Sequence, residues 1–231
     1  MAGVEERLSA VLQRMADAAV RSGRDPASIL LVGATKGVDA DRVRAAVAAG
    51  LRELGENRVQ EALPKIRAVG PGRRWHLIGH LQRNKARLAS EYFEVIHSID
   101  SPTTALALDR ALSRAGAPGR RLTVLIEVNV AGEATKHGVG PDGVEPLVAA
   151  VGACSSLVPG GLMTVAPMGG PEAVRPIFRR LRELRDGLRA GIGGDGFREL
   201  SMGMSDDFEV AIEEGATMVR IGRAIFGERA G

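Results

Sequence analysis

The chain has 231 residues, 45% of them hydrophobic and 26% charged, which is enough for one sizeable core and fits the roughly 200–250 residues of a one-domain α/β barrel. Its net charge of +3 comes from arginines scattered among acids, and aromatic residues make up only 3%, so we expect no nucleic-acid partner. No apolar run approaches the roughly 18 residues that span a membrane, and no apolar segment near the N-terminus predicts a secretory signal.

A leading helix is predicted over residues 4–22, where Leu8, Val11, Leu12, Met15 and Ala19 recur at helical spacing. Short β-branched runs then alternate with helical segments along the rest of the chain. The predicted strands cover residues 29–34, 53–55, 75–78, 95–98, 122–130, 161–163, 199–201 and 218–221. The predicted helices between them cover residues 39–49, 57–68, 84–91, 102–115, 143–154, 171–189 and 206–214, and a short last helix begins near residue 223.

Eight strand–helix units in this length favour a closed parallel barrel over an open, doubly wound sheet. An open dinucleotide-binding sheet would usually carry a glycine-rich turn after its first strand, whereas this turn reads Ala34-Thr35-Lys36-Gly37. We therefore expect one domain over residues 1–231, a (β/α)₈ TIM barrel with an extra helix over residues 1–22. Functional residues of such barrels lie at the C-terminal ends of the strands.

Lys36 lies just past the end of the first predicted strand, and it is one of only four lysines among 31 basic residues. A lysine amine can form an imine with an aldehyde, which an arginine guanidinium does not do in practice. Taken alone, Lys36 is more simply interpreted as a surface lysine of a loop.

Two glycine-containing segments at the other end of the chain change that interpretation. Loops after the seventh and eighth strands of a barrel often bind phosphate through backbone N–H groups. Here those loops read Ser201-Met202-Gly203-Met204-Ser205-Asp206-Asp207 and Arg220-Ile221-Gly222-Arg223. Part of the first segment, Ser205-Asp206, is also an ordinary helix cap. Because the first and eighth strands are neighbours in a closed barrel, Lys36 and this cradle together suit a phosphorylated aldehyde.

Three other strand ends supply candidates with two interpretations each. Asn57 could direct its amide at a cofactor ring or cap the next helix. His80 could line the mouth of the barrel or be a solvated loop residue. No second His, Cys or carboxylate cluster completes a metal site around His80, so no metal is expected. Met163 could line the mouth or fill space in the core.

These segments together resemble the family of small pyridoxal phosphate homeostasis proteins, over nearly the whole chain. The matching stretches are residues 34–36, 55–61, 75–85, 161–163, 200–207 and 220–227. The resemblance implies an alanine-racemase-type barrel that holds pyridoxal 5′-phosphate (PLP) as a Schiff base on Lys36. It implies phosphate contacts from Ser201 and the Gly222 region, with Arg220 toward the pyridine nitrogen. The expected cofactor-binding residues are Lys36, Asn57, His80, Met163, Ser201, Met204, Arg220, Gly222 and Arg223.

The sequence departs from the family at one position of this set. The family usually has threonine or serine where this chain has Arg223. An arginine could still meet the charge of a phosphate, but the hydroxyl contact would be lost.

Two kinds of enzyme remain as alternatives to a protein that holds PLP and releases it to others, such as apo PLP enzymes. A sugar-phosphate aldolase or isomerase could use Lys36 on its substrate. A racemase or decarboxylase could use PLP, but relatives of the racemase class take a second acid/base, a tyrosine, from a further β domain. This chain ends after the eighth unit, and its only tyrosine, Tyr92, falls in or just beyond the helix after the third strand. We therefore expect a carrier with no catalytic residue.

The single cysteine, Cys154, cannot form an internal disulfide and follows an apolar stretch, so a packing role is favoured. Together with the absence of a predicted signal or membrane span, this favours a cytoplasmic protein. We expect a monomer, with a weak dimer as the alternative.

Overall fold

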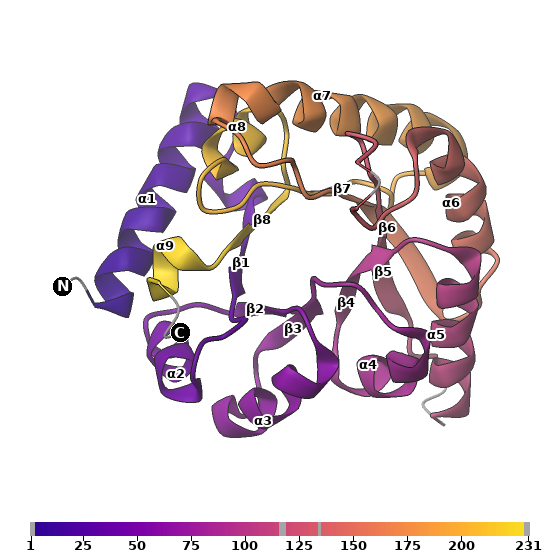
Figure 1. Ribbon diagram of the computed structural model, residues 1–231, viewed down its shortest axis with the longest axis horizontal. Coiled ribbons are helices and arrows are strands. Elements are labelled where there is room, and N and C mark those ends of the chain that lie inside the picture. The colour runs from indigo at the N-terminus through magenta and orange to yellow at the C-terminus, as the bar shows by residue number, and fades with distance from the viewer. Residues whose placement is uncertain (1–2, 116–118, 134, 229–231) are drawn as a thin grey trace.

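Eight parallel strands close into a barrel in which each strand pairs with its neighbour in chain order and β8 pairs with β1 (Figure 1). The computed structural model describes residues 3–115, 119–133 and 135–228. The strands are β1 (Leu30–Ala34), β2 (Glu53–Glu56), β3 (Arg74–Leu77), β4 (Val95–Ile99), β5 (Leu122–Glu127), β6 (Leu157–Met163), β7 (Glu199–Ser201) and β8 (Met218–Ile221). The predicted (β/α)₈ barrel is therefore confirmed.

Helices form an outer ring around the strands, because each helix returns the chain to the same end of the barrel for the next parallel strand (Figure 1). The predicted leading helix is α1 (Val4–Arg21). The others are α2 (Ala40–Ala48), α3 (Val59–Val69), α4 (Ala86–Tyr92), α5 (Pro102–Arg114), α6 (Val144–Gly152), α7 (Pro171–Leu188), α8 (Phe208–Glu213) and α9 (Arg223–Phe226). Short helical turns cover Pro26–Ser28 (η1), Arg83–Lys85 (η2), Pro141–Gly143 (η3) and Arg189–Gly193 (η4).

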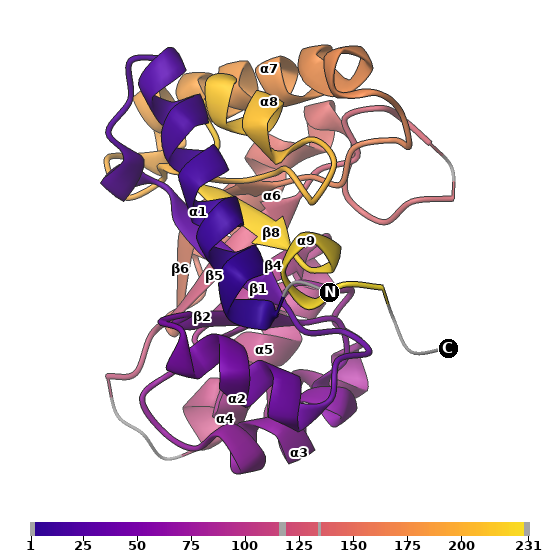
Figure 2. The ribbon, with the colours of Figure 1, turned by 90° about the vertical axis from the view of Figure 1, so that its left-hand side faces the viewer.

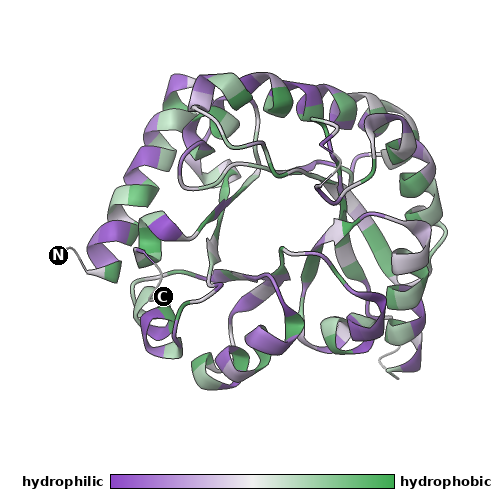
Figure 3. Ribbon diagram, viewed as in Figure 1, coloured by the Kyte–Doolittle hydropathy of each residue, from purple (hydrophilic) through white to green (hydrophobic). Residues whose placement is uncertain are grey.

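The leading helix α1 packs against α8 and α9, beside the place where β8 meets β1 (Figures 1 and 2). Its buried face includes Leu8, Val11, Met15 and Ala19, whereas Leu12 of the predicted apolar set is 47% exposed. Full burial of one such Leu or Met side chain contributes roughly 1.5–3 kcal/mol. Along the whole outer ring, apolar and polar residues alternate, as expected for helices that bury one face (Figure 3).

The fifth and sixth strands differ from their predicted lengths. The predicted strand over residues 122–130 ends at Glu127, because Asn129 turns the chain by exchanging two hydrogen bonds with the backbone of Glu133. The sixth strand begins at Leu157, four residues before its prediction. Gly161 has a φ of 155° and no room for a side chain, since a Cβ there would lie 2.0 Å from the carbonyl oxygen of Glu199.

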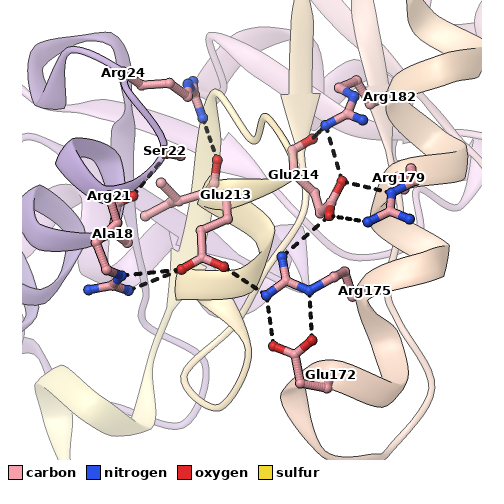
Figure 4. A network of polar contacts seen from close by, with 11 residues as sticks. Ala18, Arg21, Ser22, Arg24, Glu172, Arg175, Arg179, Arg182, Glu213 and Glu214 are labelled. Atoms are coloured by element: carbon pink, nitrogen blue, oxygen red, sulfur yellow. Dashed lines mark hydrogen bonds and ion pairs between the residues drawn. The ribbon is translucent and has the colours of Figure 1, made fainter.

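An ion-pair network ties the helices together near the closure of the barrel (Figure 4). Glu213 at the end of α8 accepts hydrogen bonds from Arg21 of α1 (3.2 Å) and Arg175 of α7 (2.8 Å). Its neighbour Glu214 is buried and accepts from three arginines of α7, namely Arg175, Arg179 and Arg182. The network therefore joins α1, α7 and α8 on the outer surface of the barrel.

Cys154, for which the sequence favoured packing, is part of the core, and so is Trp75. Trp75 is 2% exposed and Cys154 is 5% exposed, and both belong to the main hydrophobic cluster. Among residues 3–115, 119–133 and 135–228, no helix is both long and apolar enough to cross a membrane.

Candidate functional site

A cavity of about 620 Å³ opens at the C-terminal ends of β8 and β1, the end of a barrel where function is expected. Six of the nine predicted site residues line it, and they come from four different loops or strand ends. These residues are Lys36, Asn57, Met204, Arg220, Gly222 and Arg223. The closure of the barrel thus brings the first strand and the last two strands to one site, as the sequence predicted.

Lys36 has an exposed side chain in the turn that follows β1. It lines the first cavity and also a second, of about 700 Å³, which contains His80, Lys85 and His137. Of the other lysines, Lys65 is in an ion pair with Glu56, and Lys136 is 2.9 Å from Glu133. Lys36 and Lys85 are therefore the lysines that line these cavities.

Buried polar contacts fix the turn that carries Lys36. The preceding residue, Thr35, donates a 2.7 Å hydrogen bond to the fully buried carboxylate of Glu56 at the end of β2. Lys65 of α3 donates to the carbonyl oxygen of Thr35 at 2.6 Å and also pairs with Glu56. These contacts hold the backbone next to Lys36 between β1, β2 and α3. No pattern in the sequence identified this support.

Asn57 lies between the two cavities and contributes to the lining of both. The residue at the N-cap of α3 is Arg58, whose side chain makes no capping hydrogen bond. Of the two interpretations of Asn57, the structure therefore favours an amide at the cavity over a helix cap.

The loops after β7 and β8 form one wall of the first cavity. Gly222 passes close to β1, since a Cβ there would lie 3.0 Å from the carbonyl oxygen of Ala34. The Ser205 hydroxyl accepts a 3.2 Å hydrogen bond from the backbone N–H of Ala224, which links the two loops. The Met204 N–H donates to the Asp207 carboxylate at 2.6 Å. Close backbone approach and linked loops are features of a phosphate cradle.

Arg223, the departure from the family pattern, is half exposed at the same wall. Its guanidinium is paired with Asp206, which also lines the cavity, and lies 3.9 Å from Glu228. The positive charge of Arg223 at the cradle is therefore largely balanced by carboxylates of the same loops.

Arg220 is the one buried cation in the lining of the first cavity. Its Nη1 donates to the Ser201 hydroxyl at 2.6 Å and its Nη2 donates to the Thr164 carbonyl oxygen at 2.8 Å. Burial lowers the pKa of Arg220 to about 10, against the opposing effect of the buried carboxylates of Glu127 and Asp207. A pKa of about 10 leaves Arg220 protonated at neutral pH.

Behind Arg220, a chain of buried polar groups runs across the interior of the barrel. Ser201 Oγ lies 2.9 Å from His97 Nδ1, and His97 Nε2 lies 2.8 Å from His76 Nδ1. His76 Nε2 lies 2.6 Å from Glu53 Oε2. His76 and His97 were not among the site residues predicted from the sequence. Two histidines inside predicted strands were an available signal, because buried polar groups need partners.

Three predicted site residues do not line the first cavity. Met163 is fully buried inside the barrel with Leu125 and Met218. Ser201 is fully buried, and its hydroxyl is held between Arg220 and His97. His80 lines the second cavity. The structure thus favours the packing interpretation of Met163, and it makes Ser201 a support for Arg220.

Residues 7–230 match the family described as the alanine racemase N-terminal domain. The pyridoxal phosphate homeostasis protein of Aquifex aeolicus is 46% identical over 97% of each chain, and that of Escherichia coli K12 is 38% identical over 99% of this chain and 98% of its own. The chain belongs to the pyridoxal phosphate homeostasis protein family. The resemblance read from the sequence is confirmed.

Solved structures of this family have the same fold. PipY of Synechococcus elongatus with PLP bound is 37% identical, with a TM-score of 0.81 over 94% of this chain and all of PipY. The cofactor expected from the sequence is thus the one that a solved family member carries. Alanine racemase of Corynebacterium glutamicum is 19% identical, with a TM-score of 0.69 over 96% of this chain and 62% of the racemase chain, which shows a shared barrel fold.

Proposed function

We propose that this member of the family holds PLP through an imine with Lys36 and releases it to other proteins, without converting amino acids. The observation that carries the proposal is that Lys36 and Gly222 line one cavity, an amine on one side and a closely approaching backbone on the other. PLP has an aldehyde and a phosphate that match these two features. When bound, the cofactor supplies an aldehyde for the amine and an electron-accepting ring.

The residues at the cavity divide into three roles in this proposal. Lys36 forms the covalent link, and Asn57 and Met204 border the ring. The backbone around Gly222 and the Ser205 loop hold the phosphate, with Arg223 near it. Arg220 faces the ring nitrogen, and Ser201 acts on the cofactor only through Arg220. His80 and Met163 contribute no contact to the cofactor in this arrangement.

The charge of Arg220 bears on the electron-accepting power of bound PLP, although it does not by itself separate a carrier from an enzyme, because alanine racemases work with such an arginine. A protonated guanidinium cannot accept a proton from the ring nitrogen, so the ring remains neutral and is a weaker electron acceptor. The only tyrosine, Tyr92, is on the outer helix α4 and packs against the core, away from Lys36. It therefore cannot act as the acid/base opposite Lys36 that racemisation requires.

We also propose a cytoplasmic monomer whose recipients are apo PLP enzymes. The single cysteine and its burial are consistent with a reducing compartment. Gel filtration tests the monomer, and transfer of PLP to a PLP-free enzyme, read as recovered activity of that enzyme, tests delivery.

The imine is tested by absorbance and covalent trapping. Protein incubated with PLP is expected to gain the visible absorbance of a protonated imine, and borohydride reduction followed by peptide mass spectrometry should place the label on Lys36. Lys36→Ala should lose both signals with little change in stability, because the side chain is exposed. Lys85→Ala is the matched control, since Lys85 lines the second cavity and should leave both signals intact. A label that persists in Lys36→Ala would contradict the proposal.

The absence of catalysis needs a separate measurement. The PLP-loaded protein is expected to show no racemisation or decarboxylation of amino acids above the rate of free PLP. Steady turnover that disappears in Lys36→Ala would show an enzyme. If the protein fails to bind PLP but forms a borohydride-trapped adduct with a sugar phosphate at Lys36, the aldolase alternative replaces the carrier.

A further inference from the structure

Three side chains that the cofactor does not use meet at the ends of three consecutive strands. His80 follows β3, Asp100 follows β4, and His137 lies in the loop after β5. One possible ligand atom from each lies within 4.8 Å of the other two. His80 Nδ1 is 3.2 Å from Asp100 Oδ2, and the rings of His80 and His137 are stacked with their centroids 4.1 Å apart. One nitrogen of each imidazole and one carboxylate oxygen thus lie close together, with the two rings face to face.

A fourth group beside this cluster lacks a partner. Glu127, the last residue of β5, is only 9% exposed, and its Oε2 has no hydrogen-bond partner within the part of the chain that the structure describes. Burial raises the pKa of Glu127, the negative charge of Asp100 raises it further, and His137 and Arg220 oppose the shift. Glu127 therefore interacts electrostatically with two members of the cluster. A cation at the cluster would compensate both carboxylates.

We propose that His80, Asp100 and His137 bind a divalent transition metal ion of the zinc class, with Glu127 as the adjacent carboxylate. Imidazole nitrogens together with a carboxylate oxygen suit zinc, cobalt and nickel, whereas magnesium and calcium prefer oxygen ligands alone. No metal is expected from the sequence alone, because no cluster of possible ligands lies near His80 along the chain. The fold supplies the partners from loops that are distant in the sequence.

The side chains must turn to coordinate an ion, because the stacked rings hold their in-plane nitrogen lone pairs nearly parallel. Tetrahedral zinc with bonds of about 2.1 Å places its ligand atoms about 3.4 Å apart, so two ligand atoms at the 4.8 Å limit must approach each other by about 1.4 Å. His80 and His137 are exposed loop residues, so rotation about their side-chain bonds can supply this movement.

The position of the site gives the ion access to a ligand from solution. His80 and His137 both line the second cavity, which also contains Lys36. Three protein ligands leave a coordination position open on zinc, as in sites that bind water or substrate. The open position can therefore take water or a small carboxylate beside Lys36. The metal proposal does not depend on the PLP proposal, because none of the three ligands lines the first cavity.

The test is titration of the untagged protein with Zn²⁺ by isothermal calorimetry, together with Co²⁺ as a visible probe of nitrogen–oxygen coordination. One saturable site is expected. His137→Ala and Asp100→Asn should each weaken it by roughly ten-fold or more. Glu61→Gln is the matched control, because Glu61 is an acid that lines the same cavity, and it should leave the affinity unchanged. Circular dichroism and urea unfolding verify that each variant is folded.

Three results would overturn the proposal. The first is a wild-type protein without a saturable zinc site, and the second is a folded His137→Ala variant that binds zinc as tightly as the wild type. The third is loss of zinc binding in Lys36→Ala, which would assign the ion to a bound cofactor. Persistence of zinc binding in Lys36→Ala, which should lack the imine, separates the two proposals.

Discussion

Arg220 Nη1 donates a 2.6 Å hydrogen bond to Ser201 Oγ, and this bond connects the cavity to the polar interior of the barrel. With both histidines neutral, every following group can also donate in one direction: Ser201 to His97, His97 to His76, and His76 to Glu53. Each hydroxyl and ring nitrogen of the chain then has a partner, which is the condition under which a buried polar network is stabilising. These hydrogen bonds, from Arg220 to Glu53, thus hold Arg220 at a fixed place in the cavity wall.

Ser201→Ala removes the group on which both Arg220 and His97 depend. The free energy of unfolding is expected to fall by about 1–3 kcal/mol, because a buried donor and a buried acceptor lose their partner. PLP affinity should also fall, since Arg220 is no longer held from behind. Urea unfolding and titration with PLP measure the two effects.

The control for this variant is Ser113→Ala. Ser113 is exposed and shares a 3.3 Å hydroxyl contact with Ser156 on the surface, so its replacement should change neither quantity. Unchanged PLP affinity in Ser201→Ala would show that Arg220 needs no support from the hydrogen bonds behind it.

His97 makes stability depend on pH. Burial, His76 and Arg220 lower the pKa of His97 well below its ordinary value of 6.5. The unfolded chain therefore binds a proton that the folded protein excludes. Above about pH 6.5 the contribution of neutral His97 to the stability of the folded protein is complete. Below that pH, the free energy of unfolding should fall by up to about 1.4 kcal/mol for each pH unit. Urea unfolding of the PLP-free protein from about pH 7.5 down to 5.5 measures this slope.

Two variants test whether His97 causes this dependence of stability on pH. His97→Gln keeps an amide donor and acceptor but cannot titrate, so its stability should vary less with pH. His137→Ala removes an exposed histidine and should retain the wild-type slope. Equal slopes in the wild type and His97→Gln would disprove the assignment.

The sequence predicted the strand order because most strands are short apolar runs and each crossover is a helix. It placed the start of β6 too late, because Leu157, Val158 and Pro159 are held in the strand by pairing with β5, before a register shift at Gly160. Six cavity residues could be found because each lies at the C-terminal end of a strand or just after it. The role of Ser201 as a support for Arg220 could not be predicted. Its partner His97 is 104 residues away in the sequence, and only closure of the barrel brings the two together.

Arg223 and Asp206 are expected to change phosphate binding in opposite directions. Arg223→Thr removes a cation and leaves Asp206 unpaired at the cradle, so PLP affinity should fall by roughly two- to five-fold. Asp206→Asn releases Arg223 and removes a negative charge, so affinity should rise by a similar factor. Both effects should shrink as salt is added, because the two side chains are exposed. Changes of the same sign in both variants would mean that loop structure, and not charge, dominates.

Glu214 is expected to stabilise the fold without affecting the cofactor. It is buried and accepts hydrogen bonds from Arg175, Arg179 and Arg182 on α7, so Glu214→Gln leaves three neighbouring arginines with less negative charge between them. Because these arginines are partly exposed, solvent moderates the cost, and we expect a loss of roughly 1–3 kcal/mol in the free energy of unfolding.

The exposed Glu172 provides the comparison for Glu214, since Arg175 is its one ion-pair partner among the residues that the structure describes. Glu172→Gln should therefore unfold at nearly the same urea concentration as the wild type, whereas the midpoint of Glu214→Gln should be clearly lower. Both variants should keep the visible absorbance of the Lys36 imine, because neither residue lines the first cavity. If Glu172→Gln lost as much stability as Glu214→Gln, surface charge rather than the buried carboxylate would hold α7 to α8.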